Sequence, residues 1–263
     1  MKTIVVPTDF SASAEHATLY AAQMAKAIDA SVLLLHVYQM PVTMTDFPVL
    51  IVSAEELKKN ADEALKRASE NAQKAMPGVR FETESRMGDV VDEIAESCES
   101  KEVVAMVAGI KEMSGFERFL LGNTALSIIK SCTYPVITVP EDAAIALPQK
   151  MAIALDLLKD EEIPVEKIKN LAQMLQAELH IIHIALEGKE ADTAQLPEGL
   201  KEARFHSIKD RDVTTGIQHF VEQNNIDLLL VLPHKHNLYE RIFFKGHTKD
   251  LINHIPVPVA CIR

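Results

Sequence analysis

Residues able to bind a phosphate gather where two expected strands of the first half end. Thr8 and Asp9 follow the apolar run Thr3–Pro7, and Gly109 follows the run Val103–Ala108. Glycine lets a ligand approach the backbone closely, because it has no side chain beyond hydrogen. An Asp at a strand end can accept a hydrogen bond from a ribose hydroxyl or hold its own loop. These residue types predict a phosphate-bearing ligand at this edge of a sheet.

The stretch that follows the second of these strands leads directly into a helix. Residues 109–124 read GIKEMSGFERFLLGNT, and a helix is expected over Asn123–Ser131. The free backbone amides at a helix start attract an anion. Gly122, Asn123 and Thr124 are therefore the expected phosphate contacts.

Histidines are the notable residues of the second half. His234 and His236 flank Lys235, and His247 follows Gly246. Together with His183 or Asp156 they could bind zinc, which takes three or four such ligands. The alternative is a solvated polar loop, since neither a cysteine ligand nor an HxxxH spacing accompanies these histidines.

The sequence carries none of the common catalytic signatures. Gly-x-Ser-x-Gly, Walker A and Gly-x-Gly-x-x-Gly are all absent from it. His36 and His183 lie within apolar runs, which predicts hydrogen-bonded core histidines rather than catalytic ones. A protein that binds without catalysing is the resulting expectation.

An internal repeat relates the two halves. An offset of 147 residues pairs Asp9 with Asp156 and His36 with His183, and an offset of 123 pairs Pro135 with Pro258. The second copy is therefore 24 residues shorter than the first. A repeat of this length indicates a duplicated domain, joined by a linker over Glu141–Gln149.

Strand and helix patterns alternate along both copies, which predicts parallel sheets covered by helices on both faces. The expected elements of the first copy are strands at Thr3–Pro7, Val32–Val37, Phe81–Arg86, Val103–Ala108 and Val136–Val139, and helices ending near Ile28, over Ala54–Met76, Asp89–Glu99 and Asn123–Ser131. Those of the second are strands at Ala152–Leu155, Leu179–Ala185, Ala203–Ile208, Leu228–Leu232 and Val257–Ile262, and helices from Pro164 and over Val213–Glu222.

The residues missing from the second copy correspond to the long helix Ala54–Met76 of the first. One face of the second sheet must then be covered differently, because an apolar sheet face left in water is unfavourable. A short turn over Glu187–Glu198, the other half of the chain or a second subunit are the three possibilities.

The composition limits which binding partners and which cellular compartment are expected. A formal charge of −11 and a pI near 5.4 argue against a nucleic acid or an anionic membrane. Three widely spaced cysteines, with no CxxC, indicate buried free thiols in a reducing cytoplasm. The start of the sequence lacks a basic leader pattern, and no apolar run reaches the length of a membrane helix.

With these motifs in place, the chain resembles the universal stress protein family over its whole length, as a tandem of two domains at 1–142 and 150–263. ATP-binding members carry an Asp after the first strand and Gly-x2-Gly-x9-Gly-Ser/Thr after the fourth. Asp9, Gly109 and Gly122 match this pattern, whereas Glu112 replaces the second glycine and Asn123 replaces Ser/Thr. The resemblance implies two Rossmann-like domains of the adenine nucleotide alpha hydrolase-like type, each an α/β fold with a five-stranded parallel sheet of order 3-2-1-4-5.

The resemblance also implies a binding site and a mode of pairing. ATP or another adenine nucleotide is expected only in the first domain, because Leu232, Lys235 and Lys245 replace the motif residues of the second. The family pairs through the fifth strand, so an intramolecular pseudo-dimer is expected, with a short ladder at Pro258 and a homodimer also open. The candidate nucleotide contacts are Pro7, Thr8, Asp9, Val37, Ala108, Gly109, Lys111, Gly122, Asn123 and Thr124.

The leading hypothesis is therefore a non-catalytic tandem stress-response module with one degenerate nucleotide site and an unknown protein partner. Three alternatives stay open at this point. The chain could act through protein contacts alone, bind a metal or another small ligand through the histidines of the second copy, or hydrolyse ATP weakly.

Overall fold

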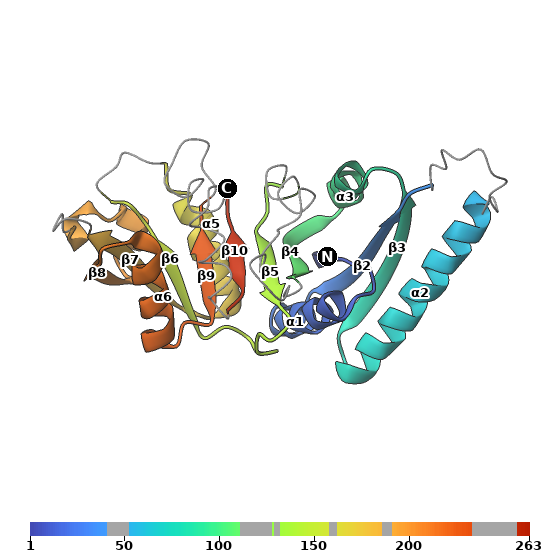
Figure 1. Ribbon diagram of the computed structural model, residues 1–263, viewed down its shortest axis with the longest axis horizontal. Coiled ribbons are helices and arrows are strands. Elements are labelled where there is room, and N and C mark those ends of the chain that lie inside the picture. The colour runs from blue at the N-terminus through green and yellow to red at the C-terminus, as the bar shows by residue number, and fades with distance from the viewer. Residues whose placement is uncertain (41–52, 111–127, 129–131, 158–161, 186–190, 233–256) are drawn as a thin grey trace.

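A computed structural model describes residues 1–40, 53–110, 128, 132–157, 162–185, 191–232 and 257–263. These residues form one ten-stranded sheet with helices on both faces (Figure 1). The two halves of the chain lie side by side, and each supplies five strands.

The first half follows the expected alternation closely. Ser11 starts the first helix by accepting a hydrogen bond from the amide of Ala14, and Asp29 ends it in the left-handed conformation. Ser53 starts the long second helix by accepting from the amide of Glu56. The elements are β1 Lys2–Pro7, α1 Ala12–Ile28, β2 Ser31–Tyr38, α2 Ala54–Ala75, β3 Arg80–Met87, α3 Val90–Glu99, β4 Glu102–Ile110 and β5 Val136–Pro140.

The second half repeats this plan in a shorter form. Its elements are β6 Lys150–Ala154, α5 Val165–Leu175, β7 Glu178–Ala185, η2 Thr193–Gln195, η3 Glu198–Leu200, β8 Arg204–Lys209, α6 Val213–Asn224, β9 Leu228–Val231 and β10 Val259–Cys261. The expected helix Asn123–Ser131 falls almost entirely outside the described residues.

Strand order confirms the expected topology in both halves. The sheet runs β3-β2-β1-β4-β5-β10-β9-β6-β7-β8, so each half has the order 3-2-1-4-5 counted within itself. All neighbours are parallel except β5 and β10, which pair antiparallel. The predicted pairing of the two halves through their fifth strands is therefore confirmed.

This central ladder is short. It joins Val136 to Cys261, Ile137 to Ala260 and Thr138 to Val259. The sequence predicts a longer strand over Val257–Ile262, but β10 begins only at Val259. Pro258 lacks an amide proton, so it cannot donate to a ladder bond.

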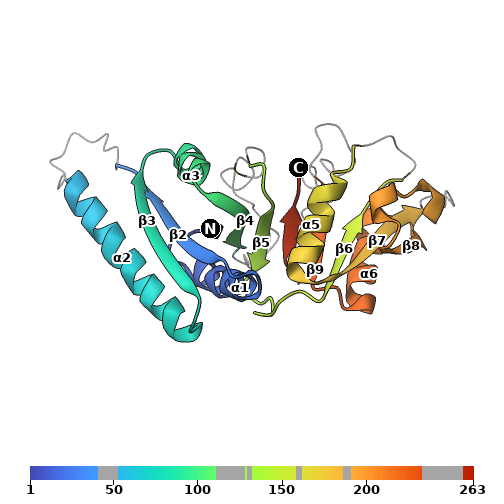
Figure 2. The ribbon, with the colours of Figure 1, turned by 180° about the vertical axis from the view of Figure 1, so that it is seen from behind.

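Two apolar layers, one on each face of the sheet, continue across the joint between the halves. The first contains buried residues of α1, α2 and α5, and the second contains buried residues of α3 and α6. Seen from behind, α5 lies in front of the central strands and α2 is the outermost helix (Figure 2). The two halves therefore share their apolar cores as well as their sheet.

A short segment covers the face that lacks a long helix in the second half. Leu196, which directly follows η2, and Leu200, the last residue of η3, are 4% and 1% exposed and belong to the layer of α5. The turn expected over Glu187–Glu198 is confirmed for its described part, which begins at Ala191. Two leucines on tight turns thus take the place of a 22-residue helix.

The described cysteines are Cys98, Cys132 and Cys261, and all three are buried thiols that form no disulfide with one another, as predicted. Within the described residues, no helix is both long enough and apolar enough to cross a membrane.

The central ladder carries a side-chain hydrogen bond that can be tested. Thr138, which is 4% exposed, donates its hydroxyl to the carbonyl of Val259 at 3.2 Å. Thr138→Val keeps the shape but removes this bond, so the free energy of unfolding should fall by about 1 kcal/mol in urea denaturation. The control Thr83→Val, at an exposed residue of β3, should change it by less than about 0.5 kcal/mol. Equal effects of the two substitutions would contradict a role for this bond in joining the halves.

Candidate functional site

A cavity of about 360 Å³ opens at the carboxyl ends of β1, β2 and β4. The described candidate residues all line it, namely Pro7, Thr8, Asp9, Val37, Ala108 and Gly109. Lys111, Gly122, Asn123 and Thr124 lie outside the described residues. The parallel sheet brings these strand ends together because the order 2-1-4 makes them neighbours.

The turn after β1 holds Asp9 in place. Phe10 takes a left-handed conformation with φ of 64°, and its amide donates to the Thr8 hydroxyl at 3.0 Å. The amide and hydroxyl of Ser11 both donate to Asp9 Oδ1, at 3.0 and 2.5 Å. A non-glycine residue in this conformation is strained, and such strain is common next to binding sites.

These contacts decide the charge of Asp9. Partial burial would raise the pKa of its carboxyl, but the hydrogen bonds from Ser11 and the nearby His36 outweigh burial and lower that pKa. Asp9 is therefore ionised at neutral pH. Both Ser11 bonds use Oδ1, so Oδ2 remains able to accept from a ligand hydroxyl.

His36 is part of the cavity wall, a role that its apolar sequence surroundings did not indicate. Its Nδ1 lies 2.7 Å from the carbonyl of Thr8, and its ring lies 4.5 Å from that of Phe10. A carbonyl only accepts, so Nδ1 of His36 carries a proton. The predicted hydrogen bond is thus confirmed, while the residue also borders the candidate site.

The repeat preserves this histidine contact in the second half. His183 Nδ1 lies 3.2 Å from the carbonyl of Leu155, which is the counterpart of Thr8 at the offset of 147. His183 is only 2% exposed, so it is a core histidine as predicted. The shared bond ties the first two strands of each half together, which indicates a structural role.

Gly109 has a structural role that the motif did not reveal. A Cβ atom added there would lie 2.1 Å from the carbonyl oxygen of Ser13 and 2.8 Å from the amide of Ala14. The sequence assigned this glycine to close approach of a phosphate. The structure shows that the first turn of α1 already occupies that position.

The second half has a different residue at this position. Leu232, the counterpart of Gly109, is 3% exposed and belongs to the apolar layer of α5. α5 begins at Val165, later in its copy than α1 does, and residues 162–164 are not helical. The second copy therefore combines a leucine with a later helix start, where the first combines a glycine with an earlier one.

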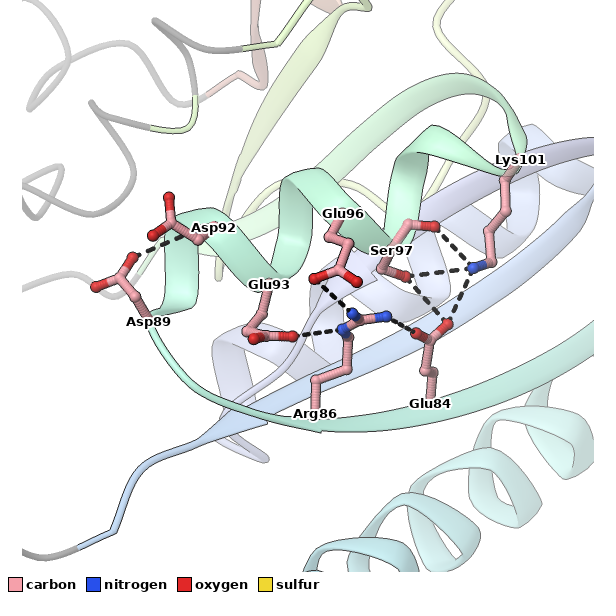
Figure 3. Close-up of polar contacts among 8 residues, drawn as sticks. All are labelled: Glu84, Arg86, Asp89, Asp92, Glu93, Glu96, Ser97 and Lys101. Atoms are coloured by element: carbon pink, nitrogen blue, oxygen red, sulfur yellow. Dashed lines mark hydrogen bonds and ion pairs between the residues drawn. The ribbon is translucent and has the colours of Figure 1, made fainter.

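An ion-pair network fixes α3, whose Val90 and Ile94 line the same cavity (Figure 3). Arg86, on β3 beside Val37, contacts Glu93 at 2.6 Å, Glu84 at 2.9 Å and Glu96 at 3.0 Å. Lys101 reaches Glu84 at 3.0 Å from the far end of the helix.

The charge of Glu84 and the cap at the helix start also help to hold α3. Burial would raise the pKa of Glu84, but hydrogen bonds from Arg86, Lys101 and Ser97 lower it. Asp89 caps the helix start by accepting from the amides of Val91 and Asp92. Arg86 and Glu84 therefore attach α3 to β3, and Asp89 satisfies the free amides at the helix start.

The histidines predicted as metal ligands, His234, His236 and His247, lie outside the described residues. Among the residues that are described, no cluster of three or more His, Cys, Asp or Glu side chains could hold a metal ion. The metal hypothesis therefore stays a prediction.

A different histidine pair in the second half was missed by sequence reasoning. His180 on β7 and His206 on β8 stack at 5.2 Å between ring centroids, with Nδ1 of His180 3.1 Å from Nε2 of His206. Phe220 of α6 packs against both rings. Only the strand pairing reveals this cluster, because the two histidines are 26 residues apart.

Charged side chains lie beside the histidine pair, but they do not cancel the effect of burial on the pKa values of the two rings. His180 Nε2 lies 3.1 Å from Glu178 Oε1, but not in hydrogen-bond geometry, and Arg204 contacts the same carboxylate. Burial lowers the pKa of His180, with Arg204 and Lys150 acting in the same direction, although Glu178 opposes them. Burial and the neighbouring His180 also lower the pKa of His206.

Substituting Gly109 tests the contact with α1. Gly109→Ala should destabilise the protein by about 1–3 kcal/mol, as overpacking does, because the Ser13 backbone must move. Chemical denaturation would measure the loss. A change below about 0.5 kcal/mol would show that α1 does not hold this position closed.

The histidine pair predicts an acid-sensitive stability. Unfolded histidine has a pKa near 6.5, and the folded values are lower, so protonation favours unfolding. The contribution of the uncharged histidine pair to the free energy of unfolding is complete above about pH 6.5 and is lost as the pH falls below that value. His206→Gln removes one titrating ring and should flatten this dependence in urea denaturation between about pH 7 and 5. An unchanged slope would contradict the assignment.

Comparison with known proteins shows which family the chain resembles. The sequence profile described as "Universal stress protein family" matches residues 1–140 and 185–263. A universal stress protein of Methanocaldococcus jannaschii is 35% identical over 144 residues, which cover 52% of this chain and 81% of that protein. A universal stress protein of Mycolicibacterium smegmatis is 27% identical over 158 residues, covering 59% of this chain and 53% of that protein.

A solved structure extends the likeness to the whole chain. The crystal structure of a universal stress protein from Archaeoglobus fulgidus covers 99% of this chain and 98% of its own, with a TM-score of 0.66 and 19% identity. At that identity the likeness concerns the fold, which is the ten-stranded arrangement described above. Since the family profile covers most of the sequence, this chain belongs to the universal stress protein family.

Proposed function

We propose that this chain is a tandem universal stress protein that binds an adenine nucleotide in the cavity of its first half and acts by binding rather than by catalysis. The observation that carries the proposal is the meeting of Pro7, Thr8, Asp9, Val37, Ala108 and Gly109 around one cavity of about 360 Å³. This volume lies within the range of about 300–1,000 Å³ typical of small-ligand sites.

The chemistry of the cavity suits a nucleoside. The ionised Asp9 can accept from ribose hydroxyls, and His36 lies in the same cavity wall. The apolar wall formed by Met106, Ile94 and Val136 suits a base. The motif assigns the phosphates to Gly122, Asn123 and Thr124, with Lys111 able to offset the charge of Glu112.

In this proposal the second half binds no nucleotide. Leu232 fills the position of Gly109 with an apolar side chain, so we assign the nucleotide to the first domain only. The proposed domain boundaries are 1–142 and 150–263, and three free buried thiols support a cytoplasmic location.

One observation favours a second candidate, a module that works through protein contacts and binds no nucleotide. The contact between Gly109 and Ser13 explains that glycine without a phosphate. Glu112 and Asn123 also depart from the ATP-binding pattern.

Calorimetric titration with ATP and Mg²⁺ up to millimolar concentration separates the two candidates. We expect one saturable site per chain, and Gly122→Val should abolish it, because the added side chain blocks approach to the backbone. The control Gly246→Val makes the same change in the second copy and should leave binding unaltered. Heat signals absent at millimolar ATP, or equally reduced by both variants, would contradict the nucleotide site. Phosphate release assayed in the same samples distinguishes binding from weak hydrolysis.

A further inference from the structure

Two of the three cysteines contact one tyrosine side chain near the amino ends of β4 and β5. Cys98 lies in the last turn of α3, and Cys132 lies four residues before β5 begins at Val136. They are 7% and 9% exposed and belong to the same apolar layer. The Tyr134 hydroxyl makes a hydrogen bond with each of the two thiols. One oxygen atom therefore brings together two sulfur atoms that are far apart in the sequence.

A single hydroxyl can serve both thiols because it has one proton to donate and lone pairs to accept. It donates to one sulfur, and the other thiol donates its proton to the hydroxyl oxygen. In the reduced protein the two sulfurs are therefore held within hydrogen-bond reach of the same atom.

The third cysteine, Cys261 on β10, stands apart from this pair. Burial alone raises the pKa of Cys261, to about 12, so neither of the other thiols acts on it. Burial also raises the pKa of Cys98, but there the hydrogen bond from Tyr134 opposes burial and the neighbouring Cys132 adds to it. The interacting thiols are therefore Cys98 and Cys132.

The repeat shows that the fold does not need sulfur at these positions. The offset of 123 pairs Cys98 with Val221, Cys132 with Ile255 and Tyr134 with Val257. Val221 is 3% exposed and belongs to the same apolar layer, against which Val257 also packs. Aliphatic side chains occupy this place in the second copy, so packing alone does not account for the thiols and the hydroxyl of the first.

A cavity reaches the tyrosine from outside. Tyr134 is only partly buried, and it lines a cavity of about 660 Å³ between α5 and the first half. Hydrogen peroxide is small and uncharged, so we expect it to reach the thiols along this side. The thiolate is the reactive form of cysteine, and a raised pKa keeps Cys98 mostly protonated, so the reaction is slow and needs sustained peroxide.

We propose that Cys98 and Cys132 form a peroxide-sensitive dithiol, which closes to an intramolecular disulfide. The thiolate of one cysteine attacks hydrogen peroxide, the O–O bond breaks, and a sulfenic acid and hydroxide form. The second thiol attacks the sulfenic sulfur, the S–S bond forms and water leaves. Two thiols are thereby oxidised and one peroxide is reduced to two molecules of water. A thiol reductant reverses the change by exchange.

The disulfide would join two parts of the first half that border the nucleotide cavity. Ile94 lies four residues before Cys98 on α3, Val136 lies four residues after Cys132, and both line that cavity. Val136 is also the first residue of β5, the strand that pairs with the second half. Oxidation would therefore fasten the helix wall of the cavity to the strand at the joint.

Mass spectrometry of the full chain tests the pairing. The reduced protein is treated with millimolar hydrogen peroxide and then alkylated in urea. We expect two of the three thiols to escape alkylation, one linked peptide pair that contains Cys98 and Cys132, and recovery of all three thiols with dithiothreitol. Peroxide treatment of the urea-unfolded chain should instead give every pairing of the three cysteines. The same mixture from folded and unfolded protein, or no disulfide between Cys98 and Cys132, would overturn the proposal.

Matched substitutions test which thiols take part. Cys98→Val installs the residue of the second copy, and Cys132→Val removes the other thiol of the pair. Each should abolish the disulfide and leave the remaining thiol to oxidise to a sulfinic acid. The control Cys261→Val keeps the pair and should form the disulfide at an unchanged rate. Thermal unfolding of each reduced variant verifies folding. A disulfide that persists in Cys98→Val, or that is lost in Cys261→Val, would contradict the assignment.

Discussion

The antiparallel pairing of β5 with β10 is the contact on which the rest of this structure depends. Both strands would otherwise be apolar edges, which tend to pair with other chains. Joined to each other, they turn two five-stranded sheets into one and let both apolar layers continue across the joint. Because the pairing is antiparallel, the carboxyl edge of the first half lies at the amino edge of the second.

Duplication left two copies that solve the same packing problem with different residues. The first copy uses the 22-residue helix α2 over its sheet, whereas the second uses Leu196 and Leu200 on two tight turns. The first copy starts its helix α1 early and needs Gly109 opposite Ser13, whereas the second starts α5 later and accommodates Leu232. Each difference is local, and the strand order is unchanged. The replacement of Gly109 by Leu232 therefore accompanies a later helix start in the second copy.

Charge in the first half is arranged around the cavity that we assign to the nucleotide. Asp9 is held ionised by Ser11, and Arg86 anchors α3 through three carboxylates. Partly exposed ion pairs contribute little stability singly, but a shared guanidinium also fixes direction. The network therefore serves chiefly to hold the helix wall of the cavity in place. In the second half the equivalent strands, β7 and β8, carry the stacked pair His180 and His206, and burial lowers the pKa of both rings.

The sequence by itself determined the repeat, the order of strands and helices, the helix caps at Ser11 and Ser53, and the strand ends where Asp9 and Gly109 meet. These features depend on residues near one another in the chain, or on a period that can be counted. The tertiary structure alone decided that Ser13 occupies the space beside Gly109, that His180 stacks on His206 and that a cavity remains between α5 and the first half. Such features depend on distances between residues far apart in sequence, which the packing of helices on a twisted sheet sets and which no local pattern records.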